Sequence, residues 1–383
     1  MRALIVLTAM TAAVPVEAQE NHQDTVPTIM VTGSPLAETG RKLKDCLARR
    51  CTPKEDIAAS LAHAENQYLA GDYEGARATL SRSHNRNARY AKTYPVEVSD
   101  LQRAYGSVTD IAGLPENGRV LQIFAFETLR AGQGGTSESA LDQLLLTGDA
   151  SLTTGRLTRA MDVYRKVERK ARESGQLQVQ GRAMLRQAGT YTTLATRAAG
   201  YDDLARRQIE RIEQTSAPEL ATYRIAAGIL RARLAASKGG EASIDKAIAT
   251  LPAKGKARLV PFYDPPLLPA DPGIGVAPPS DPEWIDLRYR VDASGRVHDV
   301  EQLRGSAHLT GDWARHVRTS VARRRYVPMD FGTDGDDLVR IERFTLVFDA
   351  FAGTGTHISG RADAARIVAL DLTPGAGEKS ASR

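Results

Sequence analysis

Cysteine, histidine and aromatic residues are scarce in this chain of 383 residues, which contains 2 cysteines, 7 histidines and 5% aromatic residues. The histidines are scattered, and no HExxH or similar metal-ligand spacing occurs. The sequence has no GxSxG nucleophile elbow, and its one SxxK tetrapeptide (Ser243 to Lys246) lacks the KTG motif that accompanies it in penicillin-binding enzymes. These absences predict a protein that is not an enzyme, with no catalytic residue, no cofactor and no metal ion.

The excess of positive over negative charge is small, with a net charge of +5 at pH 7. A nucleic-acid-binding domain carries a stronger basic patch, so we expect no nucleic-acid partner. The mild excess favours acidic surfaces such as the carboxylates of peptidoglycan. The run Arg323–Arg325 is a candidate for peptidoglycan contact. The alternative is that these cations only stabilise the negative end of a helix dipole.

Long apolar runs are confined to the first residues of the chain. Arg2 precedes an apolar stretch from Ala3 to Val14, and Val16 and Ala18 supply small residues at the −3 and −1 positions of a cleavage site. This pattern predicts a secretory signal peptide over residues 1–18 and therefore an exported protein. The stretch is shorter than the roughly 20 residues that a membrane-spanning helix needs. An uncleaved signal anchor in the inner membrane is the alternative.

The two cysteines, Cys46 and Cys51, lie close together in the sequence KDCLARRCTP. A close pair in an exported protein predicts a disulfide bond. Residues five apart on one helix do not face each other, so Thr52 and Pro53 indicate that one helix ends near Cys51 and another begins. Metal binding is the competing interpretation, but no histidine or second cysteine pair accompanies these two residues.

The segment 41–258 is predicted to be helical and repeated. Two stretches share one spacing of small and large residues, namely Ala64, Tyr68, Gly71, Tyr73, Ala76 and Leu80 in the first and Gly148, Leu152, Gly155, Leu157, Ala160 and Tyr164 in the second. This spacing resembles the tetratricopeptide repeat. The resemblance implies antiparallel helix pairs that stack into a solenoid with a concave face for partners. One further helix pair is expected at about 97–131, and an irregular helical bundle is the alternative.

Three segments outside the helical region are expected to lack regular structure. Residues 19–40 are predicted to form a flexible linker. Residues 259–283 are rich in proline and predict a stiff, extended connector. Residues 353–383 are predicted to be a C-terminal extension in the form of a mobile tail.

Residues 284–352 carry the most informative pattern. Ile285 to Val291 alternates apolar and polar residues, as a half-buried strand does, and Gly295 marks a turn. A second strand to about Leu303 alternates less cleanly, which indicates a bulge. Four apolar residues then recur every fourth position, as in an amphipathic helix: Leu309, Trp313, Val317 and Val321. Phe344 to Phe348 restores the strand pattern, so the sequence predicts a ββαβ module.

The hairpin VDASGRV, the amphipathic helix and the sequence RRRYVP before the last strand are similar to the C-terminal domain of the TonB family. The expected fold is therefore α+β in two domains: an α-helical, tetratricopeptide-like solenoid followed by a small ββαβ TonB C-terminal-like domain. The resemblance implies a domain that binds peptide segments in the bacterial periplasm. Because Arg340 to Phe348 is the last predicted strand, it is expected to leave a free edge. Its candidate peptide-pairing residues are Ile341, Arg343, Thr345 and Val347.

The sequence from Asp24 to Ser34, DTVPTIMVTGS, resembles a TonB box, the extended segment of TonB-dependent receptors. Its candidate pairing residues are Ile29, Met30, Val31 and Thr32. A β-prone linker is the alternative interpretation. The chain departs from TonB energy transducers because it has no long proline-rich periplasmic spacer and no clear membrane helix.

These features together predict a periplasmic protein-binding scaffold with a TonB-like module, associated with TonB-dependent transport. The expected partner is a periplasmic protein or peptide, such as a TonB-dependent receptor or TonB itself. Two alternatives stay open: an energy-transducing TonB-family protein held by an uncleaved signal anchor, and an enzyme with an unrecognised site on the helical domain. The sequence does not set the oligomeric state.

Overall fold

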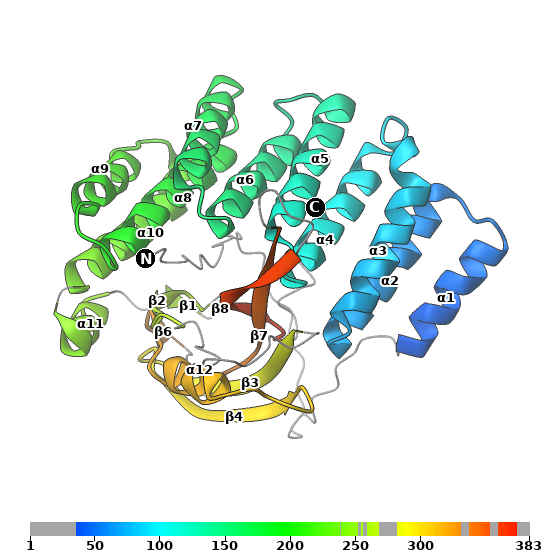
Figure 1. The fold of residues 1–383 in the computed structure, drawn as a ribbon. Helices are drawn as coiled ribbons and strands as arrows, with labels where there is room; N and C mark the ends of the chain where they lie inside the picture. The colour runs from blue at the N-terminus through cyan, green and yellow to red at the C-terminus, as the bar shows by residue number, and fades with distance from the viewer. Residues whose placement is uncertain are drawn as a thin grey trace.

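The computed structural model describes residues 36–237, 239–251, 254–255, 259–267, 282–330, 337–352 and 359–373. Within them the chain has an α+β architecture in two parts, an array of antiparallel helices followed by a small sheet region (Figure 1). The helices form an arc, and the sheet lies on the inner side of that arc. No helix in these ranges is both long and apolar enough to cross a membrane.

Eleven helices make up the array in the described residues. They are α1 (Leu36–Ala48), α2 (Pro53–Ala70), α3 (Tyr73–Asn87), α4 (Pro95–Ile111), α5 (Pro115–Gln133), α6 (Glu138–Thr153), α7 (Leu157–Glu173), α8 (Leu177–Ala195), α9 (Asp202–Glu213), α10 (Ala221–Ala236) and α11 (Gly240–Ala249). Each helix from α1 to α9 packs on the next one along the chain. The additional pair expected near 97–131 is confirmed as α4 and α5, whereas the first helix begins at Leu36, earlier than the expected boundary at 41.

The small residues of the repeated pattern lie where the helices approach each other. Ala76 and Ala160 are completely buried. A Cβ atom on Gly148 would lie 2.5 Å from the ring of Tyr164, so only glycine permits this approach. Gly71 has a φ of +86° and ends α2. The repeated pattern therefore marks residues that allow close helix packing and tight turns.

The main sheet has four antiparallel strands in the order β4-β3-β7-β8. These are β3 (Glu283–Val291), β4 (Val297–Gly305), β7 (Leu338–Ala352) and β8 (Ser359–Asp371), and helix α12 (Trp313–Ala322) follows β4. Two short pairs accompany the sheet, β1 (Lys254–Gly255) with β6 (Met329–Asp330) and β2 (Pro261–Tyr263) with β5 (Arg325–Tyr326). The register between β3 and β4 shifts twice, which confirms the expected bulge.

Two further predicted boundaries are wrong. Residues 359–371 lie in the predicted tail but form β8, which pairs with β7, and the side chains of Ala365, Ile367 and Ala369 pack on the core of the sheet. The proline-rich connector is structured at its start, where the side chain of Phe262 in β2 is buried between the helical array and Val327. Residues 268–281 of that connector lie outside the described residues.

One face of the sheet forms a core with α12. Ile285, Leu287 and Tyr289 of β3 and Phe344 of β7 pack against Trp313 of α12, and all five are almost completely buried. The expected apolar stripe of this helix is confirmed at Trp313, Val317 and Val321, while Leu309 lies before the helix and packs against the same core. The opposite face of the sheet is directed at the helical array.

Candidate functional site: the docked sheet and its edges

Strand β7 is buried on both faces. Phe344, Leu346 and Phe348 pack into the core with α12. The alternate residues point to the helical array, where Val347 packs against Tyr73 and Ile111. Because side chains alternate along a strand, one sequence supplies both contacts. The two parts of the chain therefore share an interface through β7.

Arg343 is the central residue of this interface and is completely buried. Its guanidinium group donates to both carboxylate oxygens of Asp286, at 2.7 and 2.9 Å. It also donates to the backbone oxygens of Tyr68 and Leu69, at 2.9 and 3.0 Å, and its central carbon lies 3.8 Å from the ring centroid of Trp284. These oxygens are among the last carbonyl groups of α2, which have no partner within the helix. A cation from the sheet thus caps a helix C-terminus, where the helix dipole favours positive charge.

The charge of Arg343 is retained despite burial. Burial by itself lowers the pKa of this guanidinium, but the hydrogen bonds with Asp286 reverse that effect and hold the pKa above its usual value. Asp286 is 1% exposed and also accepts a hydrogen bond from Arg304 at 2.5 Å. Two guanidinium groups therefore donate hydrogen bonds to this carboxylate, and a buried ion pair is stable only when such additional hydrogen bonds satisfy its remaining polar atoms.

A similar contact between a sheet arginine and a helix C-terminus occurs at the end of α4. Arg366 of β8 donates to the backbone oxygen of Asp110 at 2.6 Å and to its carboxylate at 3.0 Å, near the end of α4. It also donates to Asp349 at 2.9 Å. Burial raises the pKa of Asp110, an effect that Arg366 opposes. The Ala350 N–H donates to the Gly113 carbonyl at 2.6 Å, so the sheet backbone itself contacts the turn after α4.

These contacts exclude the expected role of β7 as a free peptide-pairing strand. Ile341, Arg343, Thr345 and Val347 are 6%, 0%, 2% and 1% exposed. The backbone of β7 pairs with β3 along one edge and with β8 along the other. The prediction of a free edge at this strand is therefore wrong, because β8 occupies that edge and the helical array covers the side chains.

The outer strands of the sheet are β4 and β8. β4 is irregular: Asp299 has a φ of +52°, its register shifts twice, and most of its residues are exposed or polar. Such bulges discourage pairing with a further strand. In contrast, β8 is 13 residues long, contains no proline and carries apolar residues at Ala365, Ile367 and Ala369. The β7–β8 register also shifts once, between Phe348 and Ala350, so within the described residues the regular part of this outer edge runs from Ala365 to Asp371.

The arginine run at the end of α12 is engaged within the chain. Arg324 is 5% exposed and pairs with Asp264 at 2.7 Å and with Glu342 at 2.5 Å. Burial raises the pKa of Glu342, but Arg324 and Arg340 outweigh it and hold this pKa below its usual value. Arg325 pairs with Asp245, and exposed Arg323 pairs with Glu241. Arg323 is therefore the accessible cation of the three for a peptidoglycan contact.

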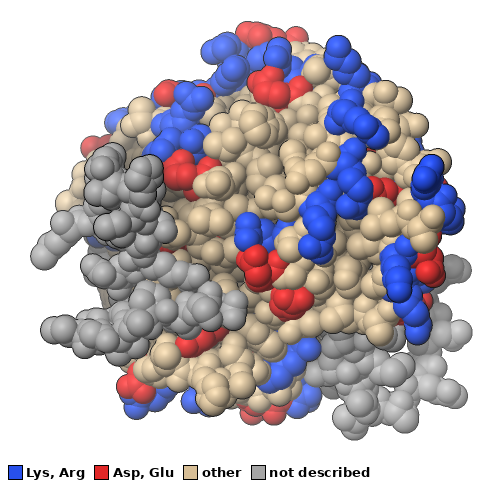
Figure 2. Space-filling view, turned by 45° about the vertical axis from the view of Figure 1, so that its right-hand side comes forward, with Lys and Arg blue, Asp and Glu red and all other residues tan. Residues whose placement is uncertain are grey.

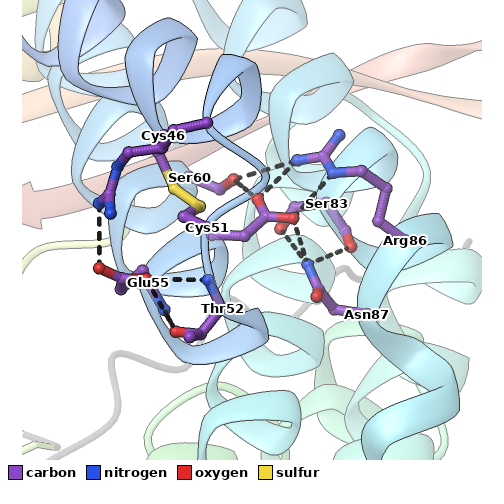
Figure 3. The surroundings of a disulfide bond; sticks show 10 residues. Cys46, Cys51, Thr52, Glu55, Ser60, Ser83, Arg86 and Asn87 are labelled. Carbon is purple, nitrogen blue, oxygen red and sulfur yellow. Dashed lines mark hydrogen bonds and ion pairs between the residues drawn. A yellow bond between two sulfur atoms is a disulfide. The ribbon is translucent and has the colours of Figure 1, made fainter.

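Cys46 and Cys51 form a disulfide bond at the corner between α1 and α2 (Figure 3). Thr52 begins α2 with a capping box, in which its hydroxyl accepts from the Glu55 N–H and the Glu55 carboxylate accepts from the Thr52 N–H. The predicted helix–turn–helix corner is confirmed. Within α1 only Thr39 and Cys46 are buried, so the disulfide bond is one of the main links that hold this helix to α2.

A buried carboxylate lies beside the corner. Asp56 accepts two hydrogen bonds from Arg86, at 2.7 and 2.8 Å, and one from Asn87 at 2.8 Å (Figure 3). Burial raises the pKa of Asp56, but these donors reverse the effect and leave the pKa below its usual value. This cluster joins α2 to α3 and has no accessible nucleophile.

Sequence comparisons assign no family to these features. No known family model matches the chain, and no curated protein is similar to it in sequence. The TonB-box-like residues Ile29, Met30, Val31 and Thr32 lie outside the described residues. Among the described residues, no group of three His, Cys, Asp or Glu side chains could hold a metal ion. On the face shown in Figure 2, most red side chains lie beside blue ones, and broad tan surface separates these mixed groups.

Proposed function

We propose that this protein is an exported, periplasmic binding scaffold in which a TonB-like C-terminal module accepts an extended peptide strand at the outer edge of β8. The helical, tetratricopeptide-like array holds that module in a fixed orientation. The expected partner is a periplasmic peptide segment, such as that of a TonB-dependent receptor, and the protein acts by binding rather than by catalysis.

The regular outer edge of β8 is the observation that carries this proposal. A strand edge offers a row of unpaired N–H and C=O groups, and an added strand gains its affinity from main-chain hydrogen bonds. β8 is held from behind, because Arg366 fixes it to α4 and the rest of the sheet is docked through Arg343. Because this edge is already ordered, peptide binding does not have to supply the entropy cost of ordering it, and this favours affinity.

The backbone register tells which groups of β8 face outward. The Leu372 N–H donates to the Ile341 carbonyl, so alternate residues at Leu370 and Val368 also point to β7. The N–H group of Ala369 therefore points away from the sheet. Ala369→Pro removes this outward donor and retains the hydrogen bonds to β7, since proline is tolerated on edge strands.

Binding of a fluorescent peptide with the sequence of residues 24–34 to the full chain tests the proposal. We expect Ala369→Pro to weaken binding by about tenfold, or about 1.4 kcal/mol. The matched control is Leu303→Pro at the bulge of β4, which should leave binding unchanged. A scrambled peptide controls for composition. Equal affinity of all three proteins, or no binding of the peptide, would contradict the proposal.

A further inference from the structure

Two hollows lie side by side on the helical array. The first, of about 580 Å³, is lined by Arg119 of α5 and by Arg156 and Arg159 at the start of α7. The second, of about 370 Å³, lies between α3, α4 and α5 and is mainly apolar. Glu116 separates them, because it lines the second hollow and pairs with two arginines of the first.

The first hollow has an excess of positive charge. Arg119 and Arg156 share the carboxylate of Glu116, at 3.0 and 2.7 Å. Arg159 is exposed and forms no ion pair within the described residues. Three guanidinium groups therefore face one carboxylate. Planar guanidinium groups bind carboxylates through paired hydrogen bonds, so this hollow fits an anionic group.

The second hollow has the opposite character. Val120 and Phe124 are 38% and 49% exposed, which is unusual for large apolar side chains on a helix that packs on both neighbours. Leu114 and Leu121 complete the apolar lining. Thr109 lines the same hollow, is 3% exposed, and its hydroxyl has no hydrogen-bond partner among the described residues. A buried hydroxyl without a partner costs stability, so this group is available to a ligand.

We infer that the two hollows form one binding site for an acidic peptide segment with an adjacent large apolar side chain. The acidic groups bind at Arg159 and its neighbours, and the apolar side chain fills the hollow beside Phe124. A backbone or side-chain group of the peptide bonds to the Thr109 hydroxyl. Both hollows are open and shallow, which suits a chain lying on the surface better than a long acyl chain that needs a deep apolar cavity. The residues that line this site are separate from those of the β8 edge.

Fluorescence anisotropy with a labelled DDDDLF peptide and the full chain tests the inference at two salt concentrations. Arg159→Glu should weaken binding by about tenfold, because it reverses a charge at the site. The matched control, Arg172→Glu, changes an exposed arginine at the other end of α7 that also has no ion pair in the described residues, and should change binding less than about twofold.

The apolar half has its own variants. Phe124→Gln should weaken binding by about fivefold, whereas Ile225→Gln, at an isoleucine of α10 that is 53% exposed, should not change it. Thr109→Val should weaken peptide binding without loss of folding stability, because it removes a hydroxyl that has no partner in the free protein.

Three results would overturn the inference. These are the absence of DDDDLF binding, an equal loss for Arg159→Glu and Arg172→Glu, and an affinity for DDDDGS equal to that for DDDDLF. Binding to phosphatidylglycerol vesicles that depends on Phe124 while DDDDLF does not bind would instead assign the site to a lipid surface. Ala369→Pro should leave DDDDLF binding unchanged, so failure here and failure at the β8 edge are distinguishable.

Discussion

The guanidinium group of Arg343 stacks on the indole ring of Trp284, with its central carbon 3.8 Å from the ring centroid. The pair lies where the sheet meets the end of α2, and a Cβ atom on Gly71 would lie 2.3 Å from the Trp284 ring. The Trp284 ring thus lies between the Arg343 guanidinium group and the turn at Gly71. This contact makes the C-terminal sheet an integral part of the helical array.

Substitution of Arg343 should destabilise the protein strongly. Arg343→Met removes the donor of the Leu69 carbonyl and one of the two donors of the Tyr68 carbonyl, which keeps the Gly71 N–H, and it leaves Asp286 with one cation fewer. Removing one partner of a buried ion pair costs about 3–5 kcal/mol. Urea unfolding followed by circular dichroism measures this change. Arg290→Met is the control, because Arg290 is a half-exposed arginine of the same sheet, and its loss should cost less than about 1 kcal/mol. Similar values for the two variants would argue against the central role of Arg343.

Gly113→Ala should destabilise the protein more than backbone strain alone can explain, because the added methyl group would clash with β7. Gly113 has a φ of +82°, and a Cβ atom there would lie 2.4 Å from the Phe348 carbonyl oxygen. Gly155 has a φ of +71° and open space around its Cβ position. Gly155→Ala should therefore cost only the left-handed backbone strain of about 1–2 kcal/mol. We expect Gly113→Ala to exceed that value clearly in the same unfolding measurement, and equal costs would exclude a steric role for the sheet contact.

Loss of the disulfide bond should release α1 selectively. The bond closes a short loop, and the chain-entropy relation gives about 2 kcal/mol for a loop of this size. In the double variant Cys46→Ser, Cys51→Ser, amide hydrogen exchange over residues 36–48 should accelerate. Exchange in α4 to α8 serves as the internal control and should not change. Uniform acceleration over the whole array would show that the bond stabilises more than α1.

The Asp56 cluster predicts a loss of stability in acid. Its pKa is lowered in the folded state, so its contribution is complete above the unfolded pKa of about 3.9 and is lost as the pH falls through the folded value. At pH 6, Asp56→Asn should cost about 2 kcal/mol, and this difference from wild type should shrink as the pH falls below about 4. Urea unfolding at pH 6, 4 and 3 measures it.

Asp312→Asn is the control for that series. Asp312 is an exposed carboxylate that pairs with Arg315 on the surface of α12. Its substitution should change stability by less than about 1 kcal/mol at every pH. A cost for Asp56→Asn that stays constant down to pH 3 would mean that the Asp56 carboxylate is not the titrating group.

Much of the local structure follows from short-range patterns. Gly71 and Gly155 end helices because they adopt positive φ angles without strain, and Ala76 and Gly148 allow close packing at any position along an array. Thr52 and Pro53 start α2 through capping alone. The strand β8 is hard to predict from the sequence because the sequence of β8, rich in alanine and charged residues, is a weak strand signal.

Local sequence patterns predict a helical segment followed by a ββαβ core, and the disulfide corner, because each depends on the periodicity or spacing of neighbouring residues. The position of the sheet on the helical array, and the regularity of its outer edges, depend instead on contacts between residues far apart in the chain. Arg343 and Asp286 are polar residues that alternate with apolar ones, so their pattern indicates an exposed strand face. This face is buried because it packs on the helical array, where the ends of α2 and α4 supply carbonyl oxygens to Arg343 and Arg366. Local sequence patterns do not reveal such contacts, because the partners lie far apart in the chain.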